Sequence, residues 1–262
     1  MAITEIIIYY VKRIVSILIF LIGLSAVAQN KALFERGNTA YNEGEYSASI
    51  AQYEKILDKG EHSAELYYNL GNAHYKLNQI APSIYYYEKA LLLKPNEPAI
   101  KNNLAYANNM TLDAIDTMPE MGFSKFYNRV VRWLSFDQWA YVAVVCMILF
   151  VLFYIAFYFF HYSTRKRIAF ILSLVCLFVS IFGAAMAFVN HSDFVSDQPA
   201  IVFDKEIAVR SEPNERGEGV FVLHEGTKVK VLESLNGYQK IKIADGKTGW
   251  LPTESIKLLK DF

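Results

Sequence analysis

The sequence has no net charge, because its 26 basic residues equal its 26 acidic ones. A nucleic-acid-binding protein normally carries a basic excess on one domain, so this balance argues against that class of partner. Only 2 cysteines occur among 262 residues, too few for a disulfide framework or a cysteine-rich zinc site. The sequence also lacks the motifs typical of serine hydrolases, zinc proteases, phosphate-binding loops and dinucleotide-binding turns.

The remaining reactive residue types form no catalytic pattern. Both cysteines, Cys146 and Cys176, lie inside long apolar runs, where they fit packing rather than redox chemistry. No two histidines are spaced four residues apart, and none has a cysteine ligand nearby; they are His62, His74, His161, His191 and His224. The sequence therefore predicts no metal site, no cofactor and no enzymatic activity.

What the chain does have is apolar residues. They make up 53% of the sequence, and the mean hydropathy is +0.18. The apolar fraction exceeds the roughly 45–50% of soluble domains, yet the mean hydropathy is too low for a protein that lies in the membrane throughout. This combination predicts water-soluble modules joined to membrane segments.

Residues 1–28 have the layout of a secretory signal peptide. Lys12 and Arg13 precede an uncharged run over residues 14–24, and small residues follow at positions 26 and 28. Signal peptidase cleaves after small residues that follow such a basic and apolar stretch, so cleavage is predicted before Gln29. No cysteine stands at the junction, which argues against a lipoprotein anchor. The alternative is an uncleaved anchor, although the run is shorter than the ~20 residues that span a bilayer.

Two later segments are long enough to cross a membrane. Residues 139–160 and residues 168–189 contain no charged side chain, and each exceeds the ~20 apolar residues that a span needs. A core helix of a soluble protein would show a polar face, which neither segment has. The sequence predicts a two-helix transmembrane hairpin with a loop over residues 161–167.

The charges around the hairpin predict its orientation. Arg165, Lys166 and Arg167 form a basic cluster in the loop, whereas Asp137 and residues 190–193 on the outer flanks include no Lys or Arg. By the positive-inside rule, the loop is cytoplasmic. The signal peptide independently exports the segment after residue 28. We therefore expect an inner-membrane protein with two spans and both large modules on the periplasmic side.

Residues 29–110 repeat with a period of 34 residues. The recurring pairs are Gly37-Asn38 and Gly71-Asn72, Tyr41 and Tyr75, Ile50 and Ile84, and Tyr53-Glu54-Lys55 and Tyr87-Glu88-Lys89. This period, with Pro95 at its end, is typical of tetratricopeptide repeats. Glycine inside a helix costs about 1 kcal/mol relative to alanine, so the partner helix is expected to approach closely at Gly37 and Gly71. Residues 98–106 resemble the first helix of a third repeat.

Two and a half repeats fall short of the roughly three that such arrays need for stability. Something must therefore cover the last apolar face, and residues 111–138 are predicted to be an amphipathic linker and cap. Basic and apolar residues interleave in this segment, which predicts a helix at the membrane surface.

Tetratricopeptide repeats bind extended peptides or partner helices in a groove lined by their first helices. The resemblance places the groove positions at Phe34, Asn38, Tyr41, Tyr68, Asn69, Asn72, Tyr75, Asn103 and Tyr106. Some relatives clamp a carboxylate with lysine, but Phe34 and Ala99 stand at those positions here, so a peptide backbone with apolar side chains is the expected ligand. We expect the asparagines to face the groove without a role in the core. For each tyrosine, the alternative is packing between helices.

After Pro199 the sequence alternates β-branched and polar residues. Strands are predicted at 200–203, 207–211, 219–223, 227–234, 238–243 and 248–251, with hairpin turns at Asn236-Gly237 and Asp245-Gly246. Ala208-Val209-Arg210-Ser211, Glu225-Gly226-Thr227 and Thr248-Gly249-Trp250-Leu251 resemble the bacterial SH3-like domain, which implies a small all-β barrel over residues 199–262. The resemblance offers Tyr238 and Trp250 as an aromatic ligand surface; a core role for Trp250 is the alternative.

The order of these segments resembles the tetratricopeptide/SH3 membrane component, the E protein, of the Bacteroides aerotolerance (Bat) operon family. The resemblance implies work beside membrane-anchored von Willebrand factor A-domain Bat proteins and a cytoplasmic MoxR-type ATPase, in oxidative or envelope stress. Two functions are open. The protein is an inner-membrane scaffold that binds partner proteins through its exported modules, or it is a cell-wall sensor that binds peptidoglycan through the barrel.

Overall fold

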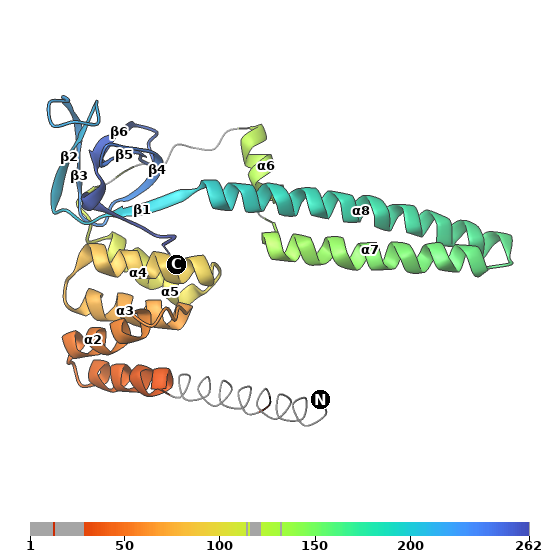
Figure 1. Cartoon of the computed structure of the whole chain (residues 1–262), viewed down its shortest axis with the longest axis horizontal. Helices are drawn as coiled ribbons and strands as arrows, with labels where there is room; N and C mark the ends of the chain where they lie inside the picture. Colours follow the sequence, from red (N-terminus) through yellow and green to blue (C-terminus); the bar gives the residue numbers. More distant parts are fainter. Residues whose placement is uncertain (1–12, 14–28, 114, 116–121, 132, 262) are drawn as a thin grey trace, which may run out of the picture. The chain divides into compact units, whose positions relative to one another are not determined.

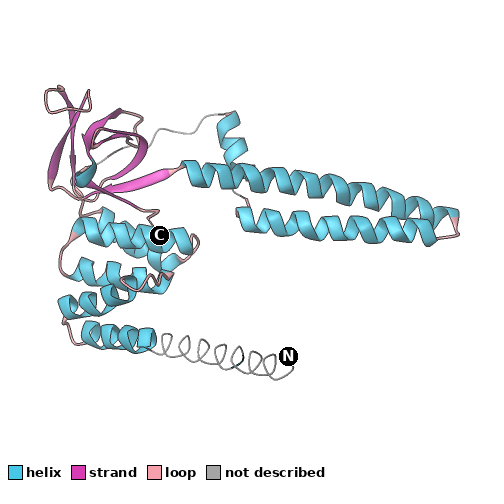
Figure 2. Cartoon of the chain, viewed as in Figure 1, coloured by secondary structure: helices cyan, strands magenta, loops and turns pink. Residues whose placement is uncertain are grey.

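The computed structural model describes residues 13, 29–113, 115, 122–131 and 133–261. The predicted signal peptide lies outside these residues, except for Arg13. The chain divides into two compact units, Met1–Asp116 with Pro199–Phe262, and Thr117–Gln198 (Figure 1). The first unit contains a helical array and a β-barrel, and the second contains two long helices and a short one (Figure 2). The predicted combination of helical repeats, two apolar helices and a small all-β domain is confirmed.

The helical array consists of antiparallel helix pairs. A helix over residues 29–42 pairs with α2 (Tyr46–Leu57), and α3 (Ala64–Lys76) pairs with α4 (Ile80–Leu93). The single helix α5 (Pro98–Asn108) then packs on α4. Local signals explain the boundaries, because Ser63 accepts a hydrogen bond from the Leu66 amide at 3.1 Å as the N-cap of α3. Proline stands at the first position of α5, where its missing N–H costs nothing.

Each repeat is held by a tyrosine ring that lies on a glycine. A Cβ atom at Gly37 would stand 2.4 Å from Tyr53 Cε1, and one at Gly71 would stand 2.6 Å from Tyr87 Cδ1. Both tyrosines are only 1% exposed. The close approach predicted at these two glycines is therefore confirmed, and burial of a ring offsets the helix cost of each glycine.

The C-terminal domain is an antiparallel barrel with strands in the order β3-β2-β6-β5-β4-β1-β7. The strands are β1 (Gln198–Val202), β2 (Glu206–Arg210), β3 (Gly219–His224), β4 (Lys228–Leu235), β5 (Tyr238–Lys242), β6 (Thr248–Pro252) and β7 (Ile256–Leu258). The predicted hairpin turn joins β4 to β5, with positive φ at both Asn236 and Gly237. The sequence reasoning found six of these strands and missed the short β7.

The barrel packs against the helical array and covers its last apolar face. Ile201 and Leu259 are completely buried and belong to the hydrophobic core of the helices rather than to that of the barrel. The ring of Phe203 meets that of Tyr85 edge-on, with centroids 5.6 Å apart. Burial of a side chain the size of Leu259 stabilises the contact by about 1.5–3 kcal/mol.

This arrangement corrects the prediction that residues 111–138 cap the repeats. Asp113 instead contacts the barrel, where it accepts hydrogen bonds from the His224 amide at 2.8 Å and from Thr227 Oγ1 at 2.5 Å. Ile115 packs into the barrel core. Helix α6 (Phe123–Val131) belongs to the other unit and contacts α8. Sequence periodicity could not reveal that a domain about 100 residues further along the chain supplies the cap.

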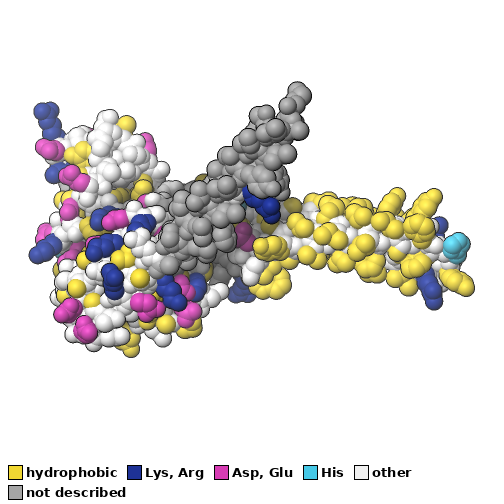
Figure 3. Space-filling view, turned by 60° about the horizontal axis from the view of Figure 1, so that its bottom comes forward, with side chains coloured by type: hydrophobic (Ala, Val, Ile, Leu, Met, Phe, Trp, Pro, Cys, Tyr) yellow, Lys and Arg dark blue, Asp and Glu magenta, His cyan; other side chains and the backbone are white. Residues whose placement is uncertain are grey.

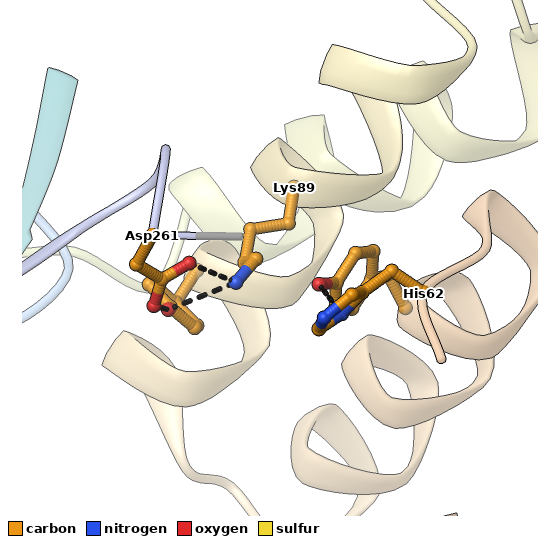
Figure 4. Close-up of polar contacts among 5 residues, drawn as sticks. His62, Lys89 and Asp261 are labelled. Carbon is orange, nitrogen blue, oxygen red and sulfur yellow. Dashed lines mark hydrogen bonds and ion pairs between the residues drawn. The ribbon is translucent and has the colours of Figure 1, made fainter. Parts of the chain in front are cut away.

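A buried lysine joins α4 to the end of the barrel (Figure 4). Lys89 is 4% exposed, and its ammonium group forms an ion pair with Asp261. Tyr85 donates its hydroxyl proton to Asp261 Oδ2 at 2.8 Å. The lysine nitrogen also lies 4.9 Å from the ring centre of Tyr67 and 5.2 Å from that of Tyr85. A buried ammonium is costly without a counter-ion, so the carboxylate and the two rings make its position tolerable.

The second unit is a hairpin of α7 (Phe136–Phe159) and α8 (Ser163–Ser196). Both helices are long and apolar enough to cross a membrane. The mean hydropathy of the most apolar 18-residue stretch, or window, is 2.8 in α7 and 2.6 in α8. Only 6% and 22% of those windows are buried, so neither is a core helix, and apolar side chains cover the hairpin surface in Figure 3. The helices meet at small residues, where Ser180 donates to the Ala143 carbonyl at 2.8 Å.

We predict that Gly226→Ala loosens the barrel from the repeats. Gly226 has φ +88°, and a Cβ there would stand 2.9 Å from Ile84 Cδ1 and 2.9 Å from Thr111 Cγ2. The variant therefore meets backbone strain and a collision with the helical array. Hydrogen exchange of the full-length protein in detergent should show faster exchange in α4 and β1.

The control for this prediction is Gly237→Ala. Gly237 also has positive φ, at +80°, but nothing lies within 4 Å of its Cβ position. This variant carries the backbone strain without the collision, so exchange in α4 should stay at the wild-type rate. Equal acceleration by the two variants would show that strain inside the barrel, rather than its contact with the repeats, is responsible.

We also predict that the junction weakens in acid. Burial raises the pKa of Asp113 and of Asp261, but hydrogen bonds from Thr227 and His224 to the first, and from Lys89 and Tyr85 to the second, outweigh it. Both pKa values consequently lie below the ordinary value of 3.8. The stabilisation from these carboxylates is complete above about pH 5 and is lost as the pH falls through their lowered pKa values.

The melting midpoint of the full-length protein, followed by near-ultraviolet circular dichroism of its tyrosines, should therefore drop between pH 5 and pH 3. The double variant Asp113→Asn and Asp261→Asn should melt lower at neutral pH and show a shallower acid dependence. Asp193→Asn, at an exposed position of α8, is the control and should retain the wild-type profile. An unchanged slope in the double variant would contradict the prediction.

Candidate functional site

A ladder of hydrogen bonds links asparagines and tyrosines along the first helices of the repeats. Tyr53 donates its hydroxyl proton to Asn38 Oδ1 at 2.7 Å, and Asn69 Nδ2 donates to the same oxygen at 3.0 Å. The oxygen of Asn38 thus joins both helices of its own repeat to the first helix of the next.

The same arrangement recurs 34 residues later. Tyr87 donates to Asn72 Oδ1 at 2.7 Å, and Asn103 Nδ2 donates to that oxygen at 2.8 Å. Asn103 Nδ2 also lies 3.0 Å from the Tyr68 hydroxyl, which accepts from it. The ladder therefore continues through α5, which stands where the first helix of a further repeat would be.

The ladder fixes the orientation of the side-chain amides. The oxygen atoms of Asn38 and Asn72 each accept two hydrogen bonds, so their Nδ2 groups must point the other way. Within the described part of the chain, no protein acceptor is bonded to either Nδ2. Two amide donors, one repeat apart, are thus held ready for a ligand.

The two asparagines line two adjoining cavities. The first, of about 310 Å³, is lined by Asn38, Tyr41, Asn42, Tyr53, Asn69 and Asn72. The second, of about 290 Å³, is lined by Tyr41, Tyr68, Asn72, Tyr75, Lys76, Tyr87, Asn103 and Tyr106. Tyr41 and Asn72 line both, so the cavities form one continuous surface, which we call the amide groove.

The hydroxyls of Tyr53 and Tyr87 keep their protons at neutral pH. Burial raises the pKa of Tyr53 and of Tyr87 above its ordinary value of 10.0, although hydrogen bonds to neighbouring side chains act in the opposite direction. Burial also raises the pKa of Tyr41, followed by the effect of Tyr46. The groove is lined by amides and phenols, with Lys76 as its one cationic lining residue among those described.

The structure brings eight of the nine predicted groove residues together in the amide groove. Phe34 is the exception, because its ring lies against that of Tyr53, with centroids 5.7 Å apart, and lines a separate cavity near the start of α3. Tyr75 contacts the hydrophobic core as well as the groove, whereas Tyr106 is largely exposed. For Tyr75, packing and groove lining are thus combined.

The expectation that the asparagines have no role in the core needs correction. Asn38 and Asn72 accept the hydroxyl protons of Tyr53 and Tyr87, which are almost completely buried. Removing either amide leaves a buried hydroxyl without its acceptor, which costs about 1–3 kcal/mol. The 34-residue offset that Asn and Tyr share was the sequence signal for this pairing.

The barrel places Tyr238 and Trp250 on neighbouring strands. Trp250 pairs with Lys240 across β5 and β6, and Tyr238 pairs with Pro252. Trp250 is 8% exposed, and the Lys240 ammonium lies 5.7 Å from its ring centre. The burial of Trp250 indicates a packing role, which was the alternative to ligand binding. Tyr238 is the more accessible of the two rings.

The three basic residues of the predicted loop are the third to fifth residues of α8. This helix begins at Ser163, so residues 160–162 alone separate it from α7. Arg165 lies over the ring of Tyr162 at 5.4 Å, and Lys166 lies over that of Phe157 at 5.0 Å. Basic side chains gather at this end of the hairpin in Figure 3.

Sequence reasoning missed two sets of residues with structural roles. The junction residues Lys89, Tyr85 and Asp261 have no local signature, because 172 positions separate the lysine from the aspartate. The second missed set joins α6 to the hairpin and is described below.

Within the described ranges, no three His, Cys, Asp or Glu side chains cluster in a way that could hold a metal ion.

Comparisons with known families agree with this architecture. Residues 205–257 match the bacterial SH3 domain, and residues 64–97, which cover α3 and α4, match the tetratricopeptide repeat. No curated protein matches the chain significantly. A tetratricopeptide repeat and a bacterial SH3 domain are therefore found in this chain, and both kinds of domain bind other molecules rather than catalyse reactions.

Proposed function

We propose that this protein is a non-enzymatic membrane adaptor whose amide groove binds an extended segment of a partner protein. The observation that carries the proposal is the pair of Nδ2 donors on Asn38 and Asn72, which bond to no acceptor among the described residues, on side chains that line two adjoining cavities. A peptide backbone presents carbonyl acceptors at regular intervals, which is the chemistry that repeated amide donors recognise.

The tyrosines of the groove supply the remaining contact area. Tyr41, Tyr75 and Tyr106 lie beside the donors and present large rings with few rotatable bonds. Such residues bury much apolar surface at a modest entropy cost, and they often dominate binding energy at protein interfaces. The groove therefore favours an uncharged or mildly acidic segment with apolar side chains, since Lys76 is its cation.

The partners that we propose are membrane-anchored von Willebrand factor A-domain proteins of the Bat type, in an envelope or oxidative-stress complex. The support is the resemblance of the segment order to the Bat membrane component, together with the two interaction domains. The runner-up, peptidoglycan binding through the barrel, draws less support from the structure. Its predicted aromatic pair includes Trp250, which is buried under Lys240.

We predict that Asn72→Asp weakens partner binding at least roughly 30-fold and leaves the fold intact. Aspartate retains an oxygen that accepts from Tyr87 and Asn103, but it replaces the Nδ2 donor with a second acceptor that repels a peptide carbonyl. Loss of a central hydrogen bond at an interface costs about 2 kcal/mol or more, or roughly 30-fold in affinity. Co-purification of partners with the full-length protein from detergent extracts is the measurement.

Two matched variants separate binding from folding. Asn72→Ala removes the acceptor of the buried Tyr87 hydroxyl and should lower the free energy of unfolding by about 1–3 kcal/mol. Asn42→Ala changes an exposed groove residue outside the ladder and should affect folding little. If Asn72→Asp keeps every partner while deletion of residues 199–262 loses them, the barrel binds the partner and the groove does not.

We further propose that both large modules face the periplasm and that the hairpin spans the inner membrane. The signal peptide predicted over residues 1–28 supports export of the repeats. Charge alone does not decide the orientation, because Lys125, Arg129 and Arg132 precede α7 on one flank as Arg165–Arg167 follow it on the other.

The orientation predicts the activity of alkaline phosphatase fusions, since this enzyme is active only outside the cytoplasm. A fusion after Asn109 and one after Lys260 should be active, and a fusion after Ser163 should be inactive. The reverse pattern would place both modules in the cytoplasm. Equal activity at all three sites would show that the hairpin does not cross the membrane.

A further inference from the structure

A set of hydrogen bonds fixes α6 at the open end of the hairpin. Trp139 Nε1 donates to the Val131 carbonyl at 3.2 Å, and Asn190 Nδ2 donates to the carbonyls of Val131 at 3.1 Å and Leu134 at 3.0 Å. These carbonyls end α6 and the turn after it, where backbone acceptors would otherwise be unpaired. We call this set the elbow.

The start of α7 reinforces the elbow. Ser135 and Gln138 form a capping box, in which the Gln138 amide donates to Ser135 Oγ at 3.2 Å and the Ser135 amide donates to Gln138 Oε1 at 3.0 Å. The chain therefore turns sharply between α6 and α7, and α6 runs across the hairpin rather than along it (Figure 1). A helix held in this way lies roughly in the plane of a membrane that the hairpin crosses.

The sequence of α6 is amphipathic. Apolar residues recur at positions 123, 126, 127 and 130, whereas polar and basic residues occupy positions 125, 128 and 129. The hairpin covers little of the apolar side, since Val131 is buried whereas Phe126 is 63% exposed. Trp133, just beyond the helix, is 76% exposed. In water this surface would be an unexplained apolar patch.

We propose that α6 is an interfacial anchor, with Phe126, Tyr127 and Trp133 inserted into the lipid headgroup layer and Arg129 facing the aqueous phase. Residues 122–136 carry three basic residues and no acidic one, which complements the anionic headgroups of a bilayer. The ring of Trp133 also meets that of Trp139 in α7 edge-on, with centroids 6.3 Å apart, so it adjoins the hairpin, which is the part of the chain suited to lipid. Aromatic residues with polar edges prefer this layer.

The inference rests on the proposed membrane span and is independent of its direction, because α6 lies at the open end of the hairpin in either orientation. Its consequence concerns the function of the adaptor. An anchor in the plane of the membrane, fixed rigidly to α7 and α8, limits rotation of the chain where it leaves the bilayer. The fraction of anionic lipid then influences how strongly α6 binds the membrane at this end of the hairpin.

Spin labels in the full-length protein test this. The background is Cys146→Ala with Cys176→Ala, and single labels are attached through Phe126→Cys, Arg129→Cys, Trp133→Cys and, at mid-span of α7, Leu152→Cys. The protein is reconstituted in vesicles of equal parts phosphatidylethanolamine and phosphatidylglycerol. Collision with oxygen, which dissolves in lipid, is compared with collision with a water-soluble nickel complex. Labels at 126 and 133 should lie about 5–10 Å below the headgroup boundary, and the label at 129 should be exposed to nickel.

Three results would overturn the proposal in distinguishable ways. If 152 is immersed but 126 and 133 collide with nickel as often as 129 does, the hairpin spans the membrane and α6 is not an anchor. If 152 is not immersed, the proposed span fails and the anchor fails with it. If the spectrum at 126 broadens through contact between spins, a second copy of the chain covers this face instead of lipid.

Discussion

The hydrogen bond from a buried tyrosine hydroxyl to an asparagine oxygen is the contact on which the helical array depends. In each repeat the tyrosine ring lies on a glycine of the first helix, and its hydroxyl donates to the asparagine that follows this glycine. Tyr87 makes these two contacts with Gly71 and Asn72. The ring requires the glycine, because any Cβ would collide with it, and the hydroxyl requires an acceptor, because it is buried. One side chain therefore sets the distance between the two helices and the orientation of the groove amide. Packing and recognition cannot vary independently at these positions.

The second constraint is that an array this short cannot bury its last face alone. The barrel resolves it by adding Ile201 and Leu259 to the helical core and by pairing Asp261 with Lys89. Lys89 in that apolar setting destabilises the protein unless the Asp261 carboxylate lies beside it. The ion pair therefore disfavours other positions of the barrel on the repeats, but it is not a large source of stability. Asp113 makes a second charged connection to His224 and Thr227. The two interaction domains consequently form one compact unit instead of modules on a flexible linker.

Local patterns predicted most of the fold. The 34-residue period, the hairpin turn at Asn236-Gly237 and the two uncharged runs each act within a short stretch of chain, and the structure confirms the elements that they indicate. The groove residues were found because first helices repeat their positions. The cap and the Lys89–Asp261 pair were not found, because they depend on contacts between residues more than 100 positions apart. The role of the asparagines was underestimated for a related reason: their acceptors are used by tyrosines of another helix.

Polar side chains, rather than apolar contacts, fix how the helices of this chain are aligned with one another. Apolar contact alone would allow α6 to slide along α8, and the repeats to shift against each other by small distances. Asn190 and Trp139 prevent the first by bonding defined carbonyls, and the Asn38 and Asn72 oxygens prevent the second by accepting from both neighbours. Each of these bonds contributes only about 1 kcal/mol net, but an alternative register would leave a buried polar group unpaired at greater cost. Side-chain amides thus fix the register at both places, whereas burial of apolar surface supplies most of the stability.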